Sequence, residues 1–380
     1  MNFDTSEEQQ LFAASIARFV EREYAFEIRR RIVTSRDGFS HDVWRSMATL
    51  GLLGLTIPPA YGGFGGAMDA MSLMEAIGDA LIVEPWLATV ALGAQLVARG
   101  GSEEQQQRML PAIGEGRMKL AFAYTEPGTR YTLAHVAARA RADEYGYAIS
   151  GVKQAVVHAA AADTLVVSVR TGGSDTDPDG ISLLLVPRNA PGLTLVSLRM
   201  LDGTRAADIA FDNVRVPSDA LVGAPGRALP LIEEVVDFAT ALICAEAVGA
   251  IRSANGATLD HLKTRKQFGV AIGSFQAVQH KAVDMHVATE RARALSYFAA
   301  LTISADDPRR RLAAAMAKAA AGECQAVVFR HGLQLFGAMG FTWENDLQFA
   351  LKRAKAGELL LGGAAEHRAI IAEEFHAADF

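Results

Sequence analysis

The feature that most constrains the fold is a series of long helical patterns from near Gly226 to the C-terminus. Apolar residues recur there at helical spacing. We predict four main helices and a shorter last one, over about 228–265, 274–302, 308–336 and 345–355, and from Ala364 onward. Long amphipathic helices joined by short loops favour an antiparallel arrangement. Residues 225–380 are therefore predicted to form a C-terminal four-helix bundle.

The preceding part of the chain has two different textures. Residues 1–118 show helical spacing interrupted by glycine- and proline-rich turns, which predicts an N-terminal all-α domain. Residues 119–224 contain several short apolar runs separated by turn residues, which predicts a middle β-domain, either a barrel or a sandwich. The fold class is therefore multi-domain α+β, in the order helical domain, β-domain and bundle.

Composition narrows the classes of function. The net charge of −6 is spread over 380 residues without a long basic block, so we expect no nucleic-acid partner. We also expect no membrane span, because no apolar run is long enough, and the N-terminus lacks a signal pattern. The two cysteines, Cys244 and Cys324, are predicted to be buried free thiols without metal-ligand spacing. A cytoplasmic protein without a metal site is expected.

The stretch from Arg265 to Asp284 carries the clearest chemical pattern. A helix is interrupted by Phe268-Gly269, and a second helix is predicted to begin near Ser274 as its N-cap. The turn would gather Arg265, the Gly269 backbone and Gln276. A guanidinium and free N–H groups at a helix start suit a phosphate. The alternative is a solvated basic turn in which Phe268 is a core plug.

This stretch, RKQFG followed by IGSFQAVQH, resembles the R-x-x-F-G…F-Q-x-x-Q stretch of the acyl-CoA dehydrogenase family. The runs LGLTIPPAYGGFGG, GSEEQQQRMLPAIGEG and DNVRVP also resemble that family, so the similarity covers essentially the whole chain. It implies that Arg265, Phe268 and Gln276 reach the FAD of a neighbouring subunit. It also implies an oxidoreductase that converts an acyl-CoA to trans-2-enoyl-CoA and passes electrons to an electron-transfer flavoprotein.

A second stretch near the C-terminus resembles the family's Q-x-x-G-G-x-G. It comprises Gln334, Phe336, Gly337, Ala338 and Gly340, with Ala338 in place of one glycine. Glycines permit close approach of the backbone to a pyrophosphate. The alternative is a helix C-cap with Gly337 and Gly340 as turn residues. In the middle domain, Tyr124 and Thr125 match further cofactor-binding positions.

The catalytic base that the resemblance implies is missing from its usual places. The two family positions match Leu361 and Ala239, and neither side chain accepts a proton. Glu246 lies seven residues after Ala239, about two helical turns along the same face, and is a weak substitute. The alternative for Glu246 is a paired structural carboxylate.

The flavin-ring side also departs from the family pattern. The strand that usually carries Trp-Ile-Thr has Ala155, Val156 and Val157 instead. The turn after Pro127 lacks a serine expected near a phosphate. The residue types expected around the flavin ring and at the base are therefore missing, whereas those expected on the opposite side of the FAD are present.

Three hypotheses follow from this asymmetry. In the first, the chain is a subunit of a heteromeric acyl-CoA dehydrogenase, and a partner chain supplies the base. The run LLLGGAAEHR and the AVV strand resemble the small subunits of pimeloyl-CoA or steroid side-chain dehydrogenases. In the second, the chain is a complete homomeric enzyme with Glu246 as a relocated base. In the third, it is a non-catalytic flavin or acyl-CoA scaffold. A homo- or hetero-oligomer, a dimer or tetramer, is expected.

Overall fold

The computed structural model describes residues 7–342 and 345–377. The chain divides into two compact units. The bundle unit comprises residues 1–29, 67–82 and 240–380, and the sheet unit comprises residues 30–66 and 83–239. Two helices, α2 (Phe26–Thr34) and α7 (Leu229–Thr264), pass from one unit to the other.

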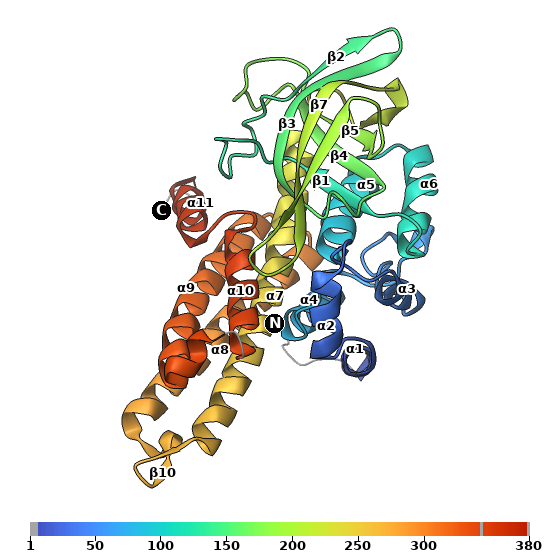
Figure 1. Cartoon of the computed structure of the whole chain (residues 1–380). Helices are drawn as coiled ribbons and strands as arrows, with labels where there is room; N and C mark the ends of the chain where they lie inside the picture. The colour runs from blue at the N-terminus through green and yellow to red at the C-terminus, as the bar shows by residue number, and fades with distance from the viewer. Residues whose placement is uncertain (1–6, 343–344, 378–380) are drawn as a thin grey trace. The chain divides into compact units, whose positions relative to one another are not determined.

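The sheet unit is built on one eight-stranded sheet. Its strand order is β6-β7-β3-β2-β4-β5-β8, and β1 pairs in parallel with β4 (Figure 1). The strands are β1 (Leu120–Ala123), β2 (Arg139–Asp143), β3 (Gly146–Val157), β4 (Thr164–Arg170), β5 (Ile181–Pro187), β6 (Leu193–Arg199), β7 (Arg205–Val216) and β8 (Leu221–Val222). All four β1 residues are buried, as are almost all residues of β4 and β5, which matches their continuous apolar sequences. The predicted middle β-domain is confirmed.

Short helices make up the rest of the sheet unit. They are α3 (His41–Thr49), η1 (Pro59–Tyr61), the π-helix η2 (Leu87–Ala94), α5 (Gln95–Gly100), α6 (Glu103–Gly114) and η3 (Ser218–Ala220). Ser102 caps α6 through a capping box with Gln105, which satisfies two of the free N–H groups at the helix start. The amide of Gln105 also donates to the carbonyl oxygens of Asp219 and Leu221, and this ties the start of α6 to the sheet.

The bundle unit is helical throughout except for one small hairpin. Its elements are α1 (Glu7–Glu23), α4 (Ala67–Asp79), the hairpin strands β9 (Lys266–Gln267) and β10 (Val270–Ala271), η4 (Ile272–Ser274), α8 (Gln276–Ser304), α9 (Arg310–Phe336), η5 (Gly337–Phe341), α10 (Leu347–Leu359) and α11 (Ala364–Ala377). The ends of α7, α8 and α9 lie within a few residues of the predicted ones. The predicted helical bundle is confirmed (Figure 1).

Small residues let the bundle helices approach closely. One core cluster is made largely of alanines from α7, α8 and α9, together with Cys244. At Gly249 on α7, a Cβ atom would lie 2.0 Å from the carbonyl oxygen of Glu75 on α4. The backbones of α4 and α7 are therefore in direct contact, and only glycine fits there. Cys244 and Cys324 are both buried and unpaired, as predicted.

One segment, Arg310–Phe341, is long and apolar enough to cross a membrane by length and composition alone. This differs from the expectation that no apolar run reaches that length. However, 67% of its most apolar window is buried inside the protein, which is also what the core helix of a bundle shows. The predicted domain boundaries after residues 118 and 224 stay predictions, because the two compact units divide the chain at other places.

Candidate functional site

The Arg265 stretch forms a tight hairpin where α7 ends. Strands β9 and β10 pair through Gln267 and Val270, which leaves Phe268 and Gly269 as the two turn residues. Both have positive φ, +54° for Phe268 and +82° for Gly269. Positive φ at both central residues is the geometry of a two-residue type I′ turn. A left-handed conformation is unusual for a phenylalanine, so the turn holds this aromatic ring at a cost in backbone energy.

Phe268 projects from this turn into solvent. Its side chain is 92% exposed, and its ring touches the edge of Phe275 at a centroid distance of 6.1 Å. The interpretation of Phe268 as a core plug is therefore wrong. An aromatic ring exposed to this extent is a candidate for contact with a ligand or a second chain.

The start of α8 differs from the prediction in its cap. The helix begins at Gln276, two residues later than expected, and its N-cap position is Phe275, which provides no side-chain hydrogen bond. Ser274 is not the N-cap, because its hydroxyl donates to the carbonyl oxygen of Ala271. The first N–H groups of α8 therefore lack a side-chain cap and can donate hydrogen bonds to an anion.

Arg265 lies at the other side of the hairpin. Its backbone N–H donates to the carbonyl oxygen of His261, and its carbonyl oxygen accepts from the N–H of Ile272. These two bonds fix its backbone, while its side chain is exposed. Within residues 7–342 and 345–377, the guanidinium has no ion-pair partner. It is thus free to bind a phosphate or carboxylate.

The second predicted glycine stretch begins where α9 ends. The N–H of Gly337 donates to the carbonyl oxygens of Gln334 and Leu333, and Gly337 has φ of +62° and ψ of −144°, a region accessible essentially only to glycine. The stretch is thus a helix end, in line with the C-cap alternative. Gln334, Gly337 and Ala338 are nevertheless exposed, so this backbone remains accessible to a ligand.

A ring stack joins the ends of α7 and α9. His261, one turn before Arg265, stacks on Phe336 with ring centroids 4.4 Å apart and planes 17° apart. The structure therefore brings Phe336 together with the helix turn that carries Arg265. Burial, and to a smaller degree the charge of Arg265, lower the pKa of His261. Sequence reasoning missed His261, and its spacing four residues before Arg265 was the available signal.

The first predicted base position, Leu361, lies in a tightly held loop between α10 and α11. Leu361 is buried and has a φ of +60°. Buried Lys318 on α9 donates to the carbonyl oxygens of Glu358 and Gly362, at 3.2 and 2.6 Å, and to that of Leu360. The imidazole of His367 lies 3.0 Å from the carbonyl oxygen of Leu361. The loop is thus fixed through its backbone carbonyl groups. Its residue 361, a leucine, has no group that can accept a proton.

The other predicted base position, Ala239, and the candidate base Glu246 are no better placed for proton transfer. Ala239 is completely buried on α7. Glu246 is 7% exposed and forms an ion pair with Arg353 of α10, whose guanidinium also donates to the carbonyl oxygen of Ile82 at 3.0 Å. This geometry corresponds to the alternative in which Glu246 is a paired structural carboxylate.

In the sheet unit, Tyr124 and Thr125 directly follow β1. The ring of Tyr124 stacks on Phe122, and burial raises the pKa of its hydroxyl group. The hydroxyl of Thr125 donates to the carbonyl oxygen of Gln154 on β3. Thr125 therefore holds its loop to β3, just before a bulge at Ala155, which has a φ of +50°.

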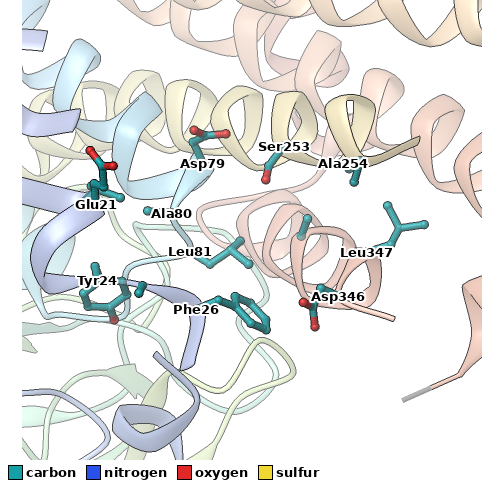
Figure 2. Close-up of a pocket in the computed structure, with 14 residues that line it drawn as sticks. Glu21, Tyr24, Phe26, Asp79, Ala80, Leu81, Ser253, Ala254, Asp346 and Leu347 are labelled. Atoms are coloured by element: carbon teal, nitrogen blue, oxygen red, sulfur yellow. The ribbon is translucent and has the colours of Figure 1, made fainter. Parts of the chain in front are cut away.

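A separate cavity of about 430 Å³ lies within the bundle unit. Figure 2 shows the carboxyl groups of Glu21, Asp79 and Asp346 around it, with Tyr24 and Phe26 among its other lining residues. None of the 14 lining residues is basic. Three carboxylates repel an anion, so this cavity does not suit the phosphates of FAD or CoA. No group of three possible ligands for a metal ion occurs among the described residues.

Comparisons with known proteins give the family. Residues 6–117, 121–214 and 229–376 match the N-terminal, middle and C-terminal domains of acyl-CoA dehydrogenases. The chain is 32% identical to the probable acyl-CoA dehydrogenase YngJ of Bacillus subtilis, over 98% of this chain and 99% of that protein.

This chain belongs to the acyl-CoA dehydrogenase family. The family comprises oxidoreductases that act on CH–CH groups and use FAD.

Solved structures with the same fold include one described as a complex and one from work on an electron transferring flavoprotein. One is the ChsE4–ChsE5 complex of Mycobacterium tuberculosis, with 25% identity, a TM-score of 0.89 and coverage of 100% of both chains. Another is from work on the electron transferring flavoprotein of Acidaminococcus fermentans, with 27% identity, a TM-score of 0.92 and coverage of 99% of both chains.

Proposed function

We propose that this chain is a subunit of an FAD-dependent acyl-CoA dehydrogenase, and that a partner chain supplies the catalytic base. The observation that carries the proposal is the contrast between the two predicted base positions and the predicted FAD-binding residues. Both base positions, Leu361 and Ala239, hold buried apolar side chains. The residues at the other FAD side, Arg265, Phe268 and Gln276, are exposed. A chain with this pattern can bind a cofactor but cannot remove an α-proton at those positions.

The residues of the hairpin and of the α9 end fit an FAD pyrophosphate. Arg265 offers an unpaired guanidinium, and the start of α8 at Gln276 offers uncapped N–H groups. The exposed turn at Gly337 and Ala338 offers accessible backbone. Bound FAD supplies the hydride acceptor for the reaction. We infer that Gln334 and Phe336 hold the FAD together with these residues. Tyr124 and Thr125 of the sheet unit remain predicted cofactor-binding residues.

The environment of Glu246 argues against a relocated base. A general base must reach the α-proton, and its carboxylate must exchange that proton. Glu246 is instead buried and ion-paired with Arg353, and breaking such a pair leaves an uncompensated buried charge. The homomeric enzyme and the non-catalytic scaffold each predict a different result when the chain is studied with and without a partner.

The relatives support two kinds of partner. The ChsE4–ChsE5 complex contains two different chains by its name, which supports a heteromer of two dehydrogenase-like subunits. The similarity to a chain studied with an electron transferring flavoprotein supports such a protein as the electron acceptor. We infer that the substrate is an acyl-CoA of the dicarboxylyl or steroid side-chain type, in keeping with the small-subunit resemblance of residues 359–368.

The decisive experiment compares this chain alone with the chain co-expressed with a second dehydrogenase-like protein that has a glutamate at either base position. We expect the two chains to co-purify with FAD, and acyl-CoA to bleach the flavin absorbance of the complex but not that of the chain alone. Robust turnover by the purified single chain would instead establish the homomeric enzyme. If flavin bleaching is absent from every combination, the scaffold hypothesis is favoured.

A matched pair of variants tests which residues hold the FAD. Arg265→Ala removes the unpaired guanidinium, and we expect the complex to lose FAD. Arg291→Ala removes another exposed arginine of the bundle unit, one that pairs with Glu323, and should leave the FAD content unchanged. Equal FAD retention in both variants would contradict the proposed phosphate site.

A further inference from the structure

We propose that His261 is a positioning residue for the FAD-phosphate site, and that its stack on Phe336 fixes Arg265 relative to the turn at Gly337. This inference rests on the proposed function. It extends that function by naming the residue that connects Arg265 to the turn at Gly337, two parts of the site that lie far apart in the sequence.

The connection runs through residues in direct contact. His261 lies in the last turn of α7 and Arg265 directly follows the helix, and the carbonyl oxygen of His261 accepts from the N–H of Arg265 at 2.9 Å. The imidazole of His261 lies flat against Phe336, the last residue of α9. A displacement of either helix end therefore disturbs the stack, which resists such movement.

The turn after α9 packs against Phe336 from its own side. A Cβ atom at Gly340 would lie 3.1 Å from the Cβ of Phe336 and 3.2 Å from the carbonyl oxygen of Leu333. The turn is thus folded tightly over this residue. The glycine turn lies close to the Cβ of Phe336, and His261 stacks on its ring, so both are next to the same side chain.

The approach of α7 to α9 continues below the stack. At Gly332, a Cβ atom would lie 3.8 Å from the hydroxyl oxygen of Thr258 and the same distance from the Cε of Met285. Gly332 of α9 thus lies next to Thr258 of α7 and Met285 of α8. The stack of His261 on Phe336 extends this contact between α7 and α9 toward Arg265.

The charge state of His261 agrees with a positioning role. Its pKa is lowered by burial and by Arg265, so the ring is neutral at neutral pH. A neutral ring stacks without adding a second positive charge beside the guanidinium. The positive charge that pairs with the phosphate therefore comes from Arg265, while His261 contributes the stacking contact of its neutral ring.

The test compares three variants of the protein as purified, with its partner chain where one co-purifies. FAD is removed and then titrated back at pH 8 while flavin fluorescence is measured, and the melting temperature is recorded for each variant. His261→Ala removes the stack, and His261→Phe restores an aromatic ring. His331→Ala is the control, because His331 is also a partly buried histidine but lies on α9, outside the stack.

We expect His261→Ala to weaken FAD binding about threefold to tenfold, because an aromatic pair is worth that factor. His261→Phe should bind FAD within about twofold of the wild type by the same argument, and His331→Ala should be unchanged. Equal affinity of His261→Ala and the wild type would overturn the inference. So would equal weakening by Ala and Phe, because that identifies a polar role for the ring.

Failure of the inference can be told apart from failure of the proposed function by including Arg265→Ala in the same titration. If Arg265→Ala loses FAD and His261→Ala does not, only the positioning role is wrong. If neither variant changes FAD binding, or if the wild type binds no FAD with or without its partner, the phosphate site itself is wrong.

Discussion

The ammonium group of Lys318 lies 2.6 Å from the carbonyl oxygen of Gly362, in the loop between α10 and α11. The same group also donates to the carbonyl oxygens of Glu358 and Leu360. Burial lowers the pKa of Lys318 to about 8, so the group is still charged at pH 7. One buried cation thus satisfies three backbone acceptors and fixes the loop that contains Leu361.

Replacing Lys318 with methionine should destabilise the protein. The variant leaves three carbonyl oxygens of a buried loop without their donor, and we expect a loss of about 2–4 kcal/mol in the free energy of unfolding. Urea denaturation measures the change, and hydrogen exchange at residues 359–363 should show that it is local. Lys355→Met removes a partly exposed lysine paired with Glu358 and should cost far less. Equal losses for both variants would contradict the role of Lys318.

His367 should make stability depend on pH. Burial, and then the charge of Lys318, lower its pKa from 6.5 to about 4. Its Nε2–H faces the carbonyl oxygen of Leu361, and its Nδ1 is buried without a hydrogen-bond partner among the described residues. Between pH 4 and 6.5 the unfolded chain therefore binds more protons than the folded one. The corresponding stability is complete above pH 6.5 and is lost as the pH falls toward 4.

The expected size of this effect is about 3 kcal/mol, because each pKa unit corresponds to about 1.4 kcal/mol. His367→Gln cannot titrate and should flatten the dependence of the free energy of unfolding on pH between 4 and 6.5. His376→Gln, which changes an exposed histidine of the same helix, should keep the wild-type slope. A wild-type slope in His367→Gln would show that other groups cause the acid sensitivity.

The sequence allowed the fold to be predicted well where periodicity is strong. The limits of α7 and α9 differ from the predicted ones by one or two residues, because long amphipathic patterns have clear ends. Strand β2 is not predictable from its sequence, RARAD, because it has exposed charges in place of an apolar alternation. Strand β8 is not predictable because two residues carry no pattern.

At the candidate site, residue types were predictable but environments were not. Phe268 was expected to be buried under one alternative because phenylalanine usually is, yet the type I′ turn exposes it. The contact between His261 and Phe336 joins two helix ends and leaves no local pattern. The carbonyl groups around Lys318 could not be predicted either, because backbone acceptors have no sequence signal.

Glu246→Gln tests whether this carboxylate is structural. Because Glu246 is paired with Arg353 inside the bundle, we expect the variant to be less stable than the wild type. Turnover of the assembled enzyme should fall by less than about tenfold, whereas loss of a general base costs about 10²–10⁴-fold. Glu75→Gln, which removes another arginine-paired carboxylate of the bundle unit, is the control. A turnover loss specific to Glu246→Gln, with FAD still bound, would identify it as the base.

Phe268→Ser separates folding from assembly. The side chain is 92% exposed, so its removal should leave the melting temperature of the isolated chain unchanged. If the ring contacts FAD or the partner chain, the complex should lose both FAD and partner, because a buried aromatic anchor in an interface is worth about 2 kcal/mol or more. Tyr145→Ser, which changes a 74% exposed residue in the turn between β2 and β3, is the matched control and should assemble normally. Size-exclusion chromatography with flavin absorbance measures both properties. Normal assembly and FAD content in Phe268→Ser would show that the exposed ring does not contribute to the shared site.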